Sequence, residues 1–178
     1  MNATEAAAVA SRLCAVCGMC CDGTMFQLVR MQAGDSPAEL IKLGMRIRRK
    51  GVELHMEQPC AGLRERCCTI YDSRPARCRA FYCQQLLLVE DRSLSEAEAQ
   101  AKIERTRHLS ERVRALIGQT GYREDGAPLQ EQFDRIMSLP VDPTLEPEQV
   151  EVRRELEKTM QELKTILRRD FLPLPGSR

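Results

Sequence analysis

The chain has 178 residues, 30% of them charged, a net charge of +1 and no tryptophan. This length suits one domain, or one domain with an extension, and the near-neutral charge gives no general attraction to nucleic acid or to a membrane surface. No apolar run reaches the roughly 20 residues that a membrane-spanning helix needs, and the alanine-rich start carries Glu5 but no basic region. We therefore expect a cytoplasmic chain without a signal peptide, with neither nucleic acid nor a membrane as partner.

The first half predicts six short elements, because its apolar runs are brief and are separated by Gly, Pro and Asp. They are a helix at 3–13, a strand at 26–29, a helix at 36–51, a strand at 52–56, an extended segment at 68–71 and a helix at 72–83. The helix at 36–51 has the clearest start, since Ser36 and Glu39 form a capping box and Pro37 lies in the first turn.

The second half has no cysteine and predicts three helices, at 95–117, 126–140 and 147–171. Ser95 and Glu98 form a capping box for the first of them. The last has a stripe of apolar residues spaced by three or four positions, which fits packing against a core, with a coiled-coil seam as the alternative. The stripe consists of Val152, Leu156, Met160, Leu163, Leu167 and Phe171. Residues 140–147 are expected to be a linker, and the tail 173–178 is expected to be disordered.

Nine cysteines dominate the chemistry, and all of them lie in the first half. Four occur within eight residues as C-x2-C-x2-C-C, from Cys14 to Cys21. In a reducing cytosol, clustered cysteines are more often metal ligands than disulfide partners. A dithiol redox pair at Cys14 and Cys17 is an alternative, and one or two cysteines could be simple buried apolar residues.

The adjacent pair Cys20 and Cys21 carries the most geometric information. Side chains of neighbouring residues usually diverge, so a single tetrahedral ion seldom takes both. We therefore expect either two metal centres or one polynuclear centre, with zinc and iron–sulfur both suited to all-sulfur ligands. Eight thiolates would complete two four-cysteine sites, and Cys67 is the expected spare thiol.

Other polar residues offer weaker indications. Arg74, Arg77 and Arg79 flank Cys78 and would offset the negative charge of a thiolate-bound metal, or they are simply solvated. The basic run 46–50 would either contact an anionic partner or be a solvated helix end. His55 is a candidate replacement ligand, although its position opposite the apolar side of the strand predicts exposure.

The cysteine pattern resembles the bacterial CxxCxxCC cysteine-cluster family, described as a zinc- or iron-chelating domain. The resemblance covers about residues 14–83 and includes Cys14-x2-Cys17-Gly18-x-Cys20-Cys21, Pro59-Cys60 and the run Cys68-Thr69-Ile70-Tyr71-x2-Arg74-Pro75-x2-Cys78-Arg79-x-Phe81-x-Cys83. It implies metal chelation by eight thiols, namely Cys14, Cys17, Cys20, Cys21, Cys60, Cys68, Cys78 and Cys83. Cys67 departs from the pattern and leaves open whether it or Cys68 binds.

Together these observations predict a mainly α protein with little β structure. A cysteine-cluster metal-binding domain at 1–90, tied together by metal, is extended at 91–178 by three helices packed on it. The expected function is metal binding, with zinc or an iron–sulfur cluster as cofactor and no assigned catalytic residue. The alternatives are a metal- or cluster-dependent enzyme, for instance one that modifies proteins, and a zinc-stapled module that contacts a protein partner through its C-terminal helices.

Overall fold

Helices dominate the protein, which is seen here as a computed structural model describing residues 3–122, 126–140 and 146–173. Of the described residues, 57% are helical and 10% are in strands, which confirms a mainly α fold. The helices are α1 (Ala3–Cys17), α2 (Pro37–Lys42), α3 (Ala76–Ala80), α4 (Gln84–Glu90), α5 (Glu96–Gln119), α6 (Leu129–Ser138) and α7 (Pro147–Ile166), which continues as a π-helical turn over Leu167–Phe171. The strands are β1 (Leu28–Arg30), β2 (Ile47–Lys50), β3 (Glu53–Glu57), β4 (Leu63–Arg64) and β5 (Cys67–Cys68).

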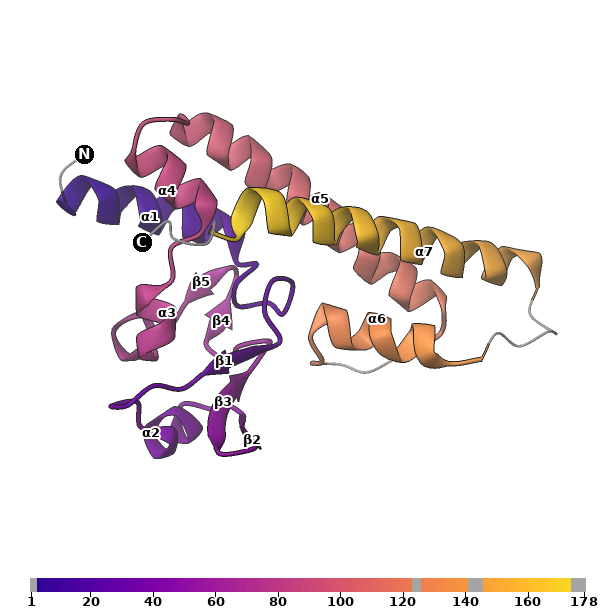
Figure 1. Ribbon diagram of the computed structural model, residues 1–178, viewed down its shortest axis with the longest axis horizontal. Coiled ribbons are helices and arrows are strands. Elements are labelled where there is room, and N and C mark those ends of the chain that lie inside the picture. The colour runs from indigo at the N-terminus through magenta and orange to yellow at the C-terminus, as the bar shows by residue number, and fades with distance from the viewer. Residues whose placement is uncertain (1–2, 123–125, 141–145, 174–178) are drawn as a thin grey trace.

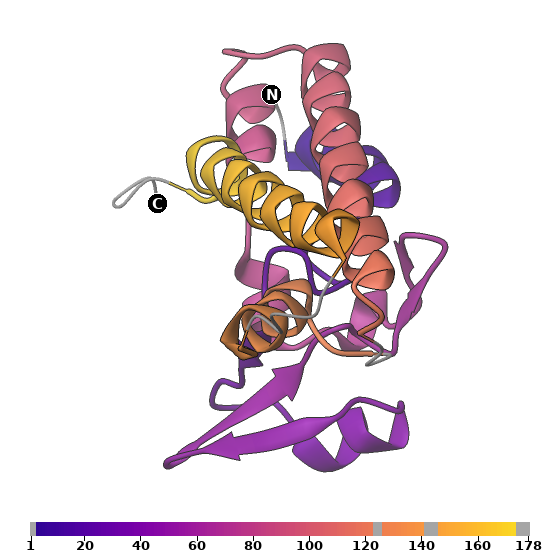
Figure 2. The same cartoon turned by 90° about the vertical axis from the view of Figure 1, so that its right-hand side faces the viewer.

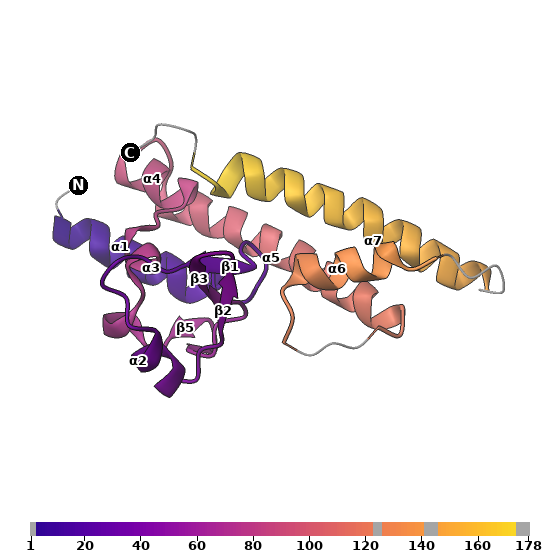
Figure 3. The ribbon, with the colours of Figure 1, turned by 60° about the horizontal axis from the view of Figure 1, so that its bottom comes forward.

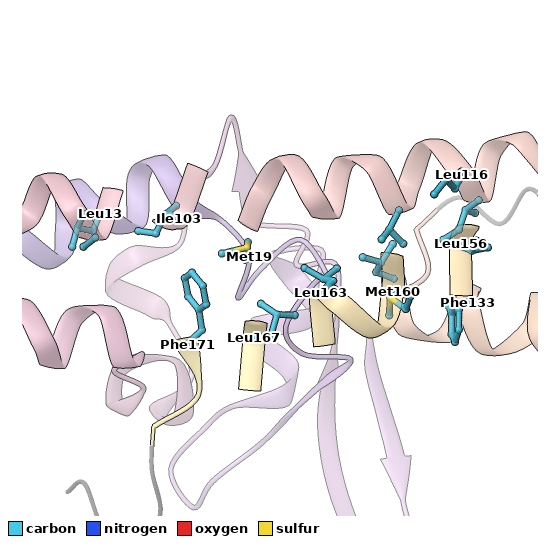
Figure 4. Packing of buried hydrophobic residues seen from close by; sticks show 14 of the residues in the cluster. Leu13, Met19, Ile103, Leu116, Phe133, Leu156, Met160, Leu163, Leu167 and Phe171 are labelled. Atoms are coloured by element: carbon cyan, nitrogen blue, oxygen red, sulfur yellow. The ribbon is translucent and has the colours of Figure 1, made fainter. Parts of the chain in front are cut away.

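The long helices form one layer of the molecule. Helices α5 and α7 lie side by side and run in opposite directions, while α1 and α4 pack against the first part of α5 (Figure 1). Their apolar sides meet in one large core, to which α1 contributes Leu13 and α4 contributes Leu86. Figure 4 shows the stripe of α7, ending at Phe171, directed toward this core. Four of the six stripe residues, namely Leu156, Met160, Leu163 and Phe171, are at most 2% exposed. The stripe therefore packs against a core, as expected, and does not form the alternative coiled-coil seam.

The three C-terminal helices are confirmed close to their expected bounds. Helix α5 begins at a capping box, in which Ser95 Oγ accepts a hydrogen bond from the Glu98 backbone N–H at 3.2 Å and the Glu98 carboxylate accepts one from Ser95 N at 2.9 Å. The hydrogen bonds of a capping box join residues only three positions apart, so the sequence alone can specify such a helix start. The described helices include none long and apolar enough to cross a membrane.

Two small antiparallel sheets form the opposite side of the molecule, away from α5 and α7 (Figure 2). The larger has the strand order β1-β3-β2, and the smaller is the β4–β5 hairpin. A second, smaller core lies against the three-stranded sheet and contains Leu40, Met45, Met56, Cys60 and Ile70. This core has few apolar residues to stabilise it, which leaves a role for metal in holding the region together.

The predicted helix at 36–51 was wrong beyond its first turns. Its cap is present, because Ser36 Oγ accepts from Glu39 N at 3.3 Å, but α2 ends at Lys42. Gly44 follows with φ +86°, a left-handed conformation that stops a helix. The basic run then forms strand β2 and pairs with β3, with Ile47 opposite Met56.

The predicted helix at 72–83 was also too long. Helix α3 stops at Ala80 because Phe81 is extended, and the Phe81 ring packs edge-on against Phe26 with 5.0 Å between centroids. Cys83 instead precedes α4, a helix that the sequence analysis did not identify. Of the expected extended segment 68–71, only Cys68 lies in a strand.

The loop after Cys21 joins the two halves of the chain. Arg114 on α5 donates to the Asp22 carbonyl at 3.0 Å, and Leu129 at the start of α6 donates to the Gly23 carbonyl at 3.0 Å. A side chain at Gly23 would meet Pro128 Cα at 3.0 Å, so only glycine permits this approach. Figure 3 shows α6 beside α7, at the end of α5 far from α4.

The division into domains at residue 90 stays a prediction. The expected linker 140–147 and tail 173–178 fall mostly on 141–145 and 174–178, which lie outside the described residues.

Candidate metal centre

The cysteine-rich run continues directly from helix α1. Cys14 and Cys17 lie in its last turn, three residues apart and therefore on one side of the helix. Gly18 then ends the helix with φ +71°, and its carbonyl accepts hydrogen bonds from Cys21 N at 2.8 Å and Asp22 N at 3.0 Å. Met19, fully buried, anchors the turn in the large core, so Cys20 and Cys21 are held on a fixed loop.

The later cysteines come from four separate elements. Cys60 follows β3, Cys67 and Cys68 form β5, Cys78 lies on α3 and Cys83 precedes α4. The backbone N–H of Cys60 donates to the Cys21 carbonyl at 2.7 Å, which joins this part to the first run. Helix α1 also contacts β5. The fold thus collects thiols that are up to 69 positions apart in sequence.

All nine cysteines line a single cavity of about 750 Å³. Cys14 and Cys67 are exposed, Cys60 is buried and the other six are half-buried, and all nine are free thiols. Apolar side chains such as Phe26, Phe81 and Met56 line the rest of the wall. A wall of this kind excludes water and favours thiolate–metal bonds over hydrated ions.

The two cores divide the thiols between them. Cys17 and Cys83 pack against the large helical core, whereas Cys60, Cys21, Cys68 and Cys78 belong to or pack against the small core beside the sheet. Cys21 thus packs against the small core, whereas neither core includes its neighbour Cys20.

The electrostatic neighbours of each thiol follow the same division. In one set, burial and the neighbouring Cys83 and Cys14 together raise the pKa of Cys17 to about 12, with burial as the largest cause. Burial likewise raises the pKa of Cys20 well above its ordinary value, and Cys17 and Cys83 contribute more to this rise than Cys21 and Cys14 do. We refer to this set as the first thiol group, and it consists of Cys14, Cys17, Cys20 and Cys83.

The other set surrounds Cys21. Burial raises the pKa of Cys21, and Cys60, Cys78 and Cys68 raise it further, in that order. Burial also raises the pKa of Cys78 to about 11, again with Cys60 as the first contributing thiol. The second thiol group consists of Cys21, Cys60, Cys68 and Cys78. The two groups are adjacent, since Cys14 and Cys21 also influence one another.

One of the three expected arginines acts on both groups. Burial raises the pKa of Cys14 to about 11, while the positive charge of Arg74 opposes this rise. Arg74 has the same opposing effect on Cys78. Its guanidinium is held in place over the Tyr71 ring at 3.6 Å, and its Nε donates to the Tyr71 carbonyl at 3.0 Å. Arg77 also lines the cavity, whereas Arg79 donates to the Arg74 carbonyl.

Two methionines contact the thiols, which no pattern in the sequence indicates. The Cys20 thiol donates to Met25 Sδ at 3.8 Å in the first group, and the Cys60 thiol donates to Met45 Sδ at 3.6 Å in the second. No spacing rule links these pairs, since Met45 and Cys60 meet only through the fold.

His55 does not line the thiol cavity, and its expected exposure was wrong. His55 is only 9% exposed. In the sheet register it lies between Arg30 of β1 and Arg48 of β2, and long arginine side chains cover their neighbours. Its Nε2 faces Glu53 Oε2 at 3.6 Å.

The donor set suits soft metal ions, but a site for a single ion is not preformed. Among the described residues, no three Cys, His, Asp or Glu side chains are close enough to hold one ion. Sulfurs around one zinc ion would lie about 3.8 Å apart, given Zn–S bonds of about 2.3 Å in a tetrahedron. No three thiols of the described residues have this arrangement in the structure.

Comparison with known proteins identifies one family. No curated protein and no solved structure matches the chain. The family model CxxCxxCC, described as "Putative zinc- or iron-chelating domain", matches residues 13–110, which is 98 of the 178 residues. The match extends beyond the cysteine run that carries the resemblance and includes α4 and the first part of α5. The chain therefore belongs to the CxxCxxCC family of zinc- or iron-chelating domains.

Proposed function

We propose that the protein holds two adjacent four-cysteine metal centres, one in each thiol group. The observation that carries this proposal is the division of the thiols into two sets of electrostatic neighbours, with Cys20 in one set and Cys21 in the other. Six of the eight thiols also pack against one core or the other, in agreement with these sets. Each group then supplies the four thiolates of a closed tetrahedral site or of a cluster. Cys67 is the spare thiol of the proposal, because its neighbour Cys68 packs against the small core and Cys67 does not.

We favour iron–sulfur clusters over single zinc ions as the occupants. In a [4Fe–4S] cluster each of the four thiolates binds a different iron, so that irons and inorganic sulfides separate the thiolates. The described residues form no ready site for a single ion, and the cavity of about 750 Å³ has room for more, which supports an occupant larger than one ion. When bound, such clusters would supply one-electron transfer, whereas zinc would supply structure alone.

The residues of the chain itself would hold and protect these centres. Arg74, placed between the two groups, would offset part of the negative charge that four thiolates bring to each centre. The apolar wall would limit access of water. Since closed four-thiolate sites leave no open position for a substrate, we propose no catalytic step.

The cellular setting proposed from the sequence agrees with this chemistry. Nine free thiols suit a reducing compartment such as the cytoplasm. The helices α5 to α7 lie outside most of the thiol cavity and stay the proposed surface for a protein partner.

Metal and sulfide analysis of anaerobically isolated protein, combined with its absorption spectrum, tests the proposal. We expect a brown protein with broad visible absorption and with iron and acid-labile sulfide in equal amounts. A colourless protein with two zinc ions per chain would support two centres but would show that they are not iron–sulfur clusters. One metal ion per chain would reject both.

A further inference from the structure

A second cavity, of about 240 Å³, lies between the three-stranded sheet and the start of α6. Its charged and amide side chains come from both halves of the chain and are Arg46, Arg48, Arg135, Glu57, Glu131, Gln27 and Gln58. Gln58 lines the thiol cavity as well, but no cysteine lines this one. Its chemistry is therefore separate from that of the metal centres.

The arginines in this cavity outnumber the carboxylates. Among the described residues, Glu57 pairs with both Arg46 and Arg48, at N···O distances of 3.3 and 3.2 Å, while Glu131 pairs with Arg135 at 2.9 Å. The two distances to Glu57 exceed the roughly 2.7–2.9 Å of a tight charge-assisted hydrogen bond. Within the described part of the chain, Glu57 is the sole ionic partner of Arg48. A guanidinium offers five N–H donors, so Arg48 retains donors for an anion.

Gln58 adds an unmatched acceptor to these donors. The residue is 1% exposed, and its Oε1 has no hydrogen-bond partner among the described residues. A buried polar atom without a partner is costly and usually marks a position that water or a ligand completes. The matching ligand must therefore combine negative charge with a proton that it can donate.

The start of α6 completes the cavity and fixes its shape. Arg46 Nη2 donates to the Gly126 carbonyl at 2.7 Å, which links the sheet to the segment before the helix. Ala127 and Pro128 line the cavity just before Leu129, the first residue of this ten-residue helix.

We propose that this cavity binds a small phosphate compound, either hydrogen phosphate or a hydroxylated phosphomonoester. The phosphate oxygens accept hydrogen bonds from Arg48 and its neighbouring arginines, and a ligand hydroxyl donates to Gln58 Oε1. The volume equals that of about eight liquid waters at about 30 Å³ each. It holds a phosphate with a few further atoms and is too small for a nucleotide. The site does not depend on the metal centres.

Calorimetric titration of the full chain, with its metal bound and at constant ionic strength, tests this site. The probes are inorganic phosphate, glycerol phosphate and sulfate, which has no proton to donate near neutral pH. We expect one saturable site for at least one of the two phosphate compounds and weaker binding of sulfate. Tighter binding of glycerol phosphate would identify an ester as the ligand class, and tighter binding of inorganic phosphate the free ion.

Substitutions at two positions of β2 provide the matched comparison. Arg48→Gln should weaken phosphate binding about tenfold, because it removes a charged hydrogen-bond donor. Arg49→Gln should leave it unchanged, because Arg49 is adjacent in the strand but does not line the cavity. Arg135→Gln, on α6, provides a second test if Arg48→Gln lowers the helix content or metal content. Absence of saturable binding, equal binding of sulfate, or equal weakening by Arg49→Gln would overturn the proposal.

Discussion

Serine substitutions at the adjacent residues Cys20 and Cys21 provide the sharpest test of two centres. Cys17 and Cys83 are the thiols that most raise the pKa of Cys20, whereas Cys60 and Cys78 are those that most raise the pKa of Cys21. A serine oxygen is a poor ligand for soft metal ions, so each substitution should empty one centre. We therefore expect each single variant to retain about half of the metal and sulfide per chain, and the double variant to retain almost none.

The two single variants should also differ in where the fold loosens. Cys21 packs against the small core beside the sheet, so Cys21→Ser should lower the amide protection of β3. Loss of Cys20 should affect the end of α1 and the start of α4, where its group lies. Helices α5 and α7 should stay protected in both, because their contacts with one another do not involve the thiols.

Metal and sulfide analysis, together with hydrogen exchange followed by mass spectrometry, measures both effects. Cys67→Ser is the matched control, because it removes an exposed thiol from the same cavity and should leave the metal content unchanged. Complete loss of metal in either single variant would refute the assignment of Cys20 and Cys21 to separate centres. So would a double variant that retains as much metal as the single variants.

Further predictions concern metal uptake and the stability of the fold. Because burial raises the pKa of most of the candidate thiols, they are protonated near neutral pH, and each centre should release about four protons on metal uptake. Metal affinity should therefore rise with pH. Calorimetry in buffers of different ionisation enthalpy measures the protons released, and fewer than two protons per centre would contradict this prediction. Ser95→Ala should lower the free energy of unfolding by about 1 kcal/mol through loss of the α5 cap, as measured by urea denaturation. Leu163→Ala should cost about 2–5 kcal/mol in the same assay, since the side chain is fully buried in the large core. Gly23→Ala should lower the melting temperature of the protein more than Gly121→Ala does, because both glycines have a positive φ but only Gly23 approaches Pro128. Equal melting temperatures of the two variants would show that this contact is unimportant.

Local signals made the C-terminal helices predictable. The Ser95–Glu98 capping box and the apolar spacing along α7 act within a few residues, and the structure has both helices close to their expected bounds. The helix expected at 36–51 shows the limit of such signals. Its cap at Ser36 is correct, but strand pairing with β3 determines the structure after Gly44, and the partner strand lies beyond that segment.

The sequence by itself determined the kind of chemistry, because the order and spacing of the cysteines place the chain in a chelating family. It also indicated that Cys20 and Cys21 would diverge, because adjacent side chains point apart. Only the tertiary structure decided which thiols gather around each of them. That depends on how α1, β5, α3 and α4 pack, and packing joins residues that are far apart in the chain. The cavity between Arg48 and α6 could not be predicted for the same reason, since no sequence spacing relates a strand of the first half to a helix of the second.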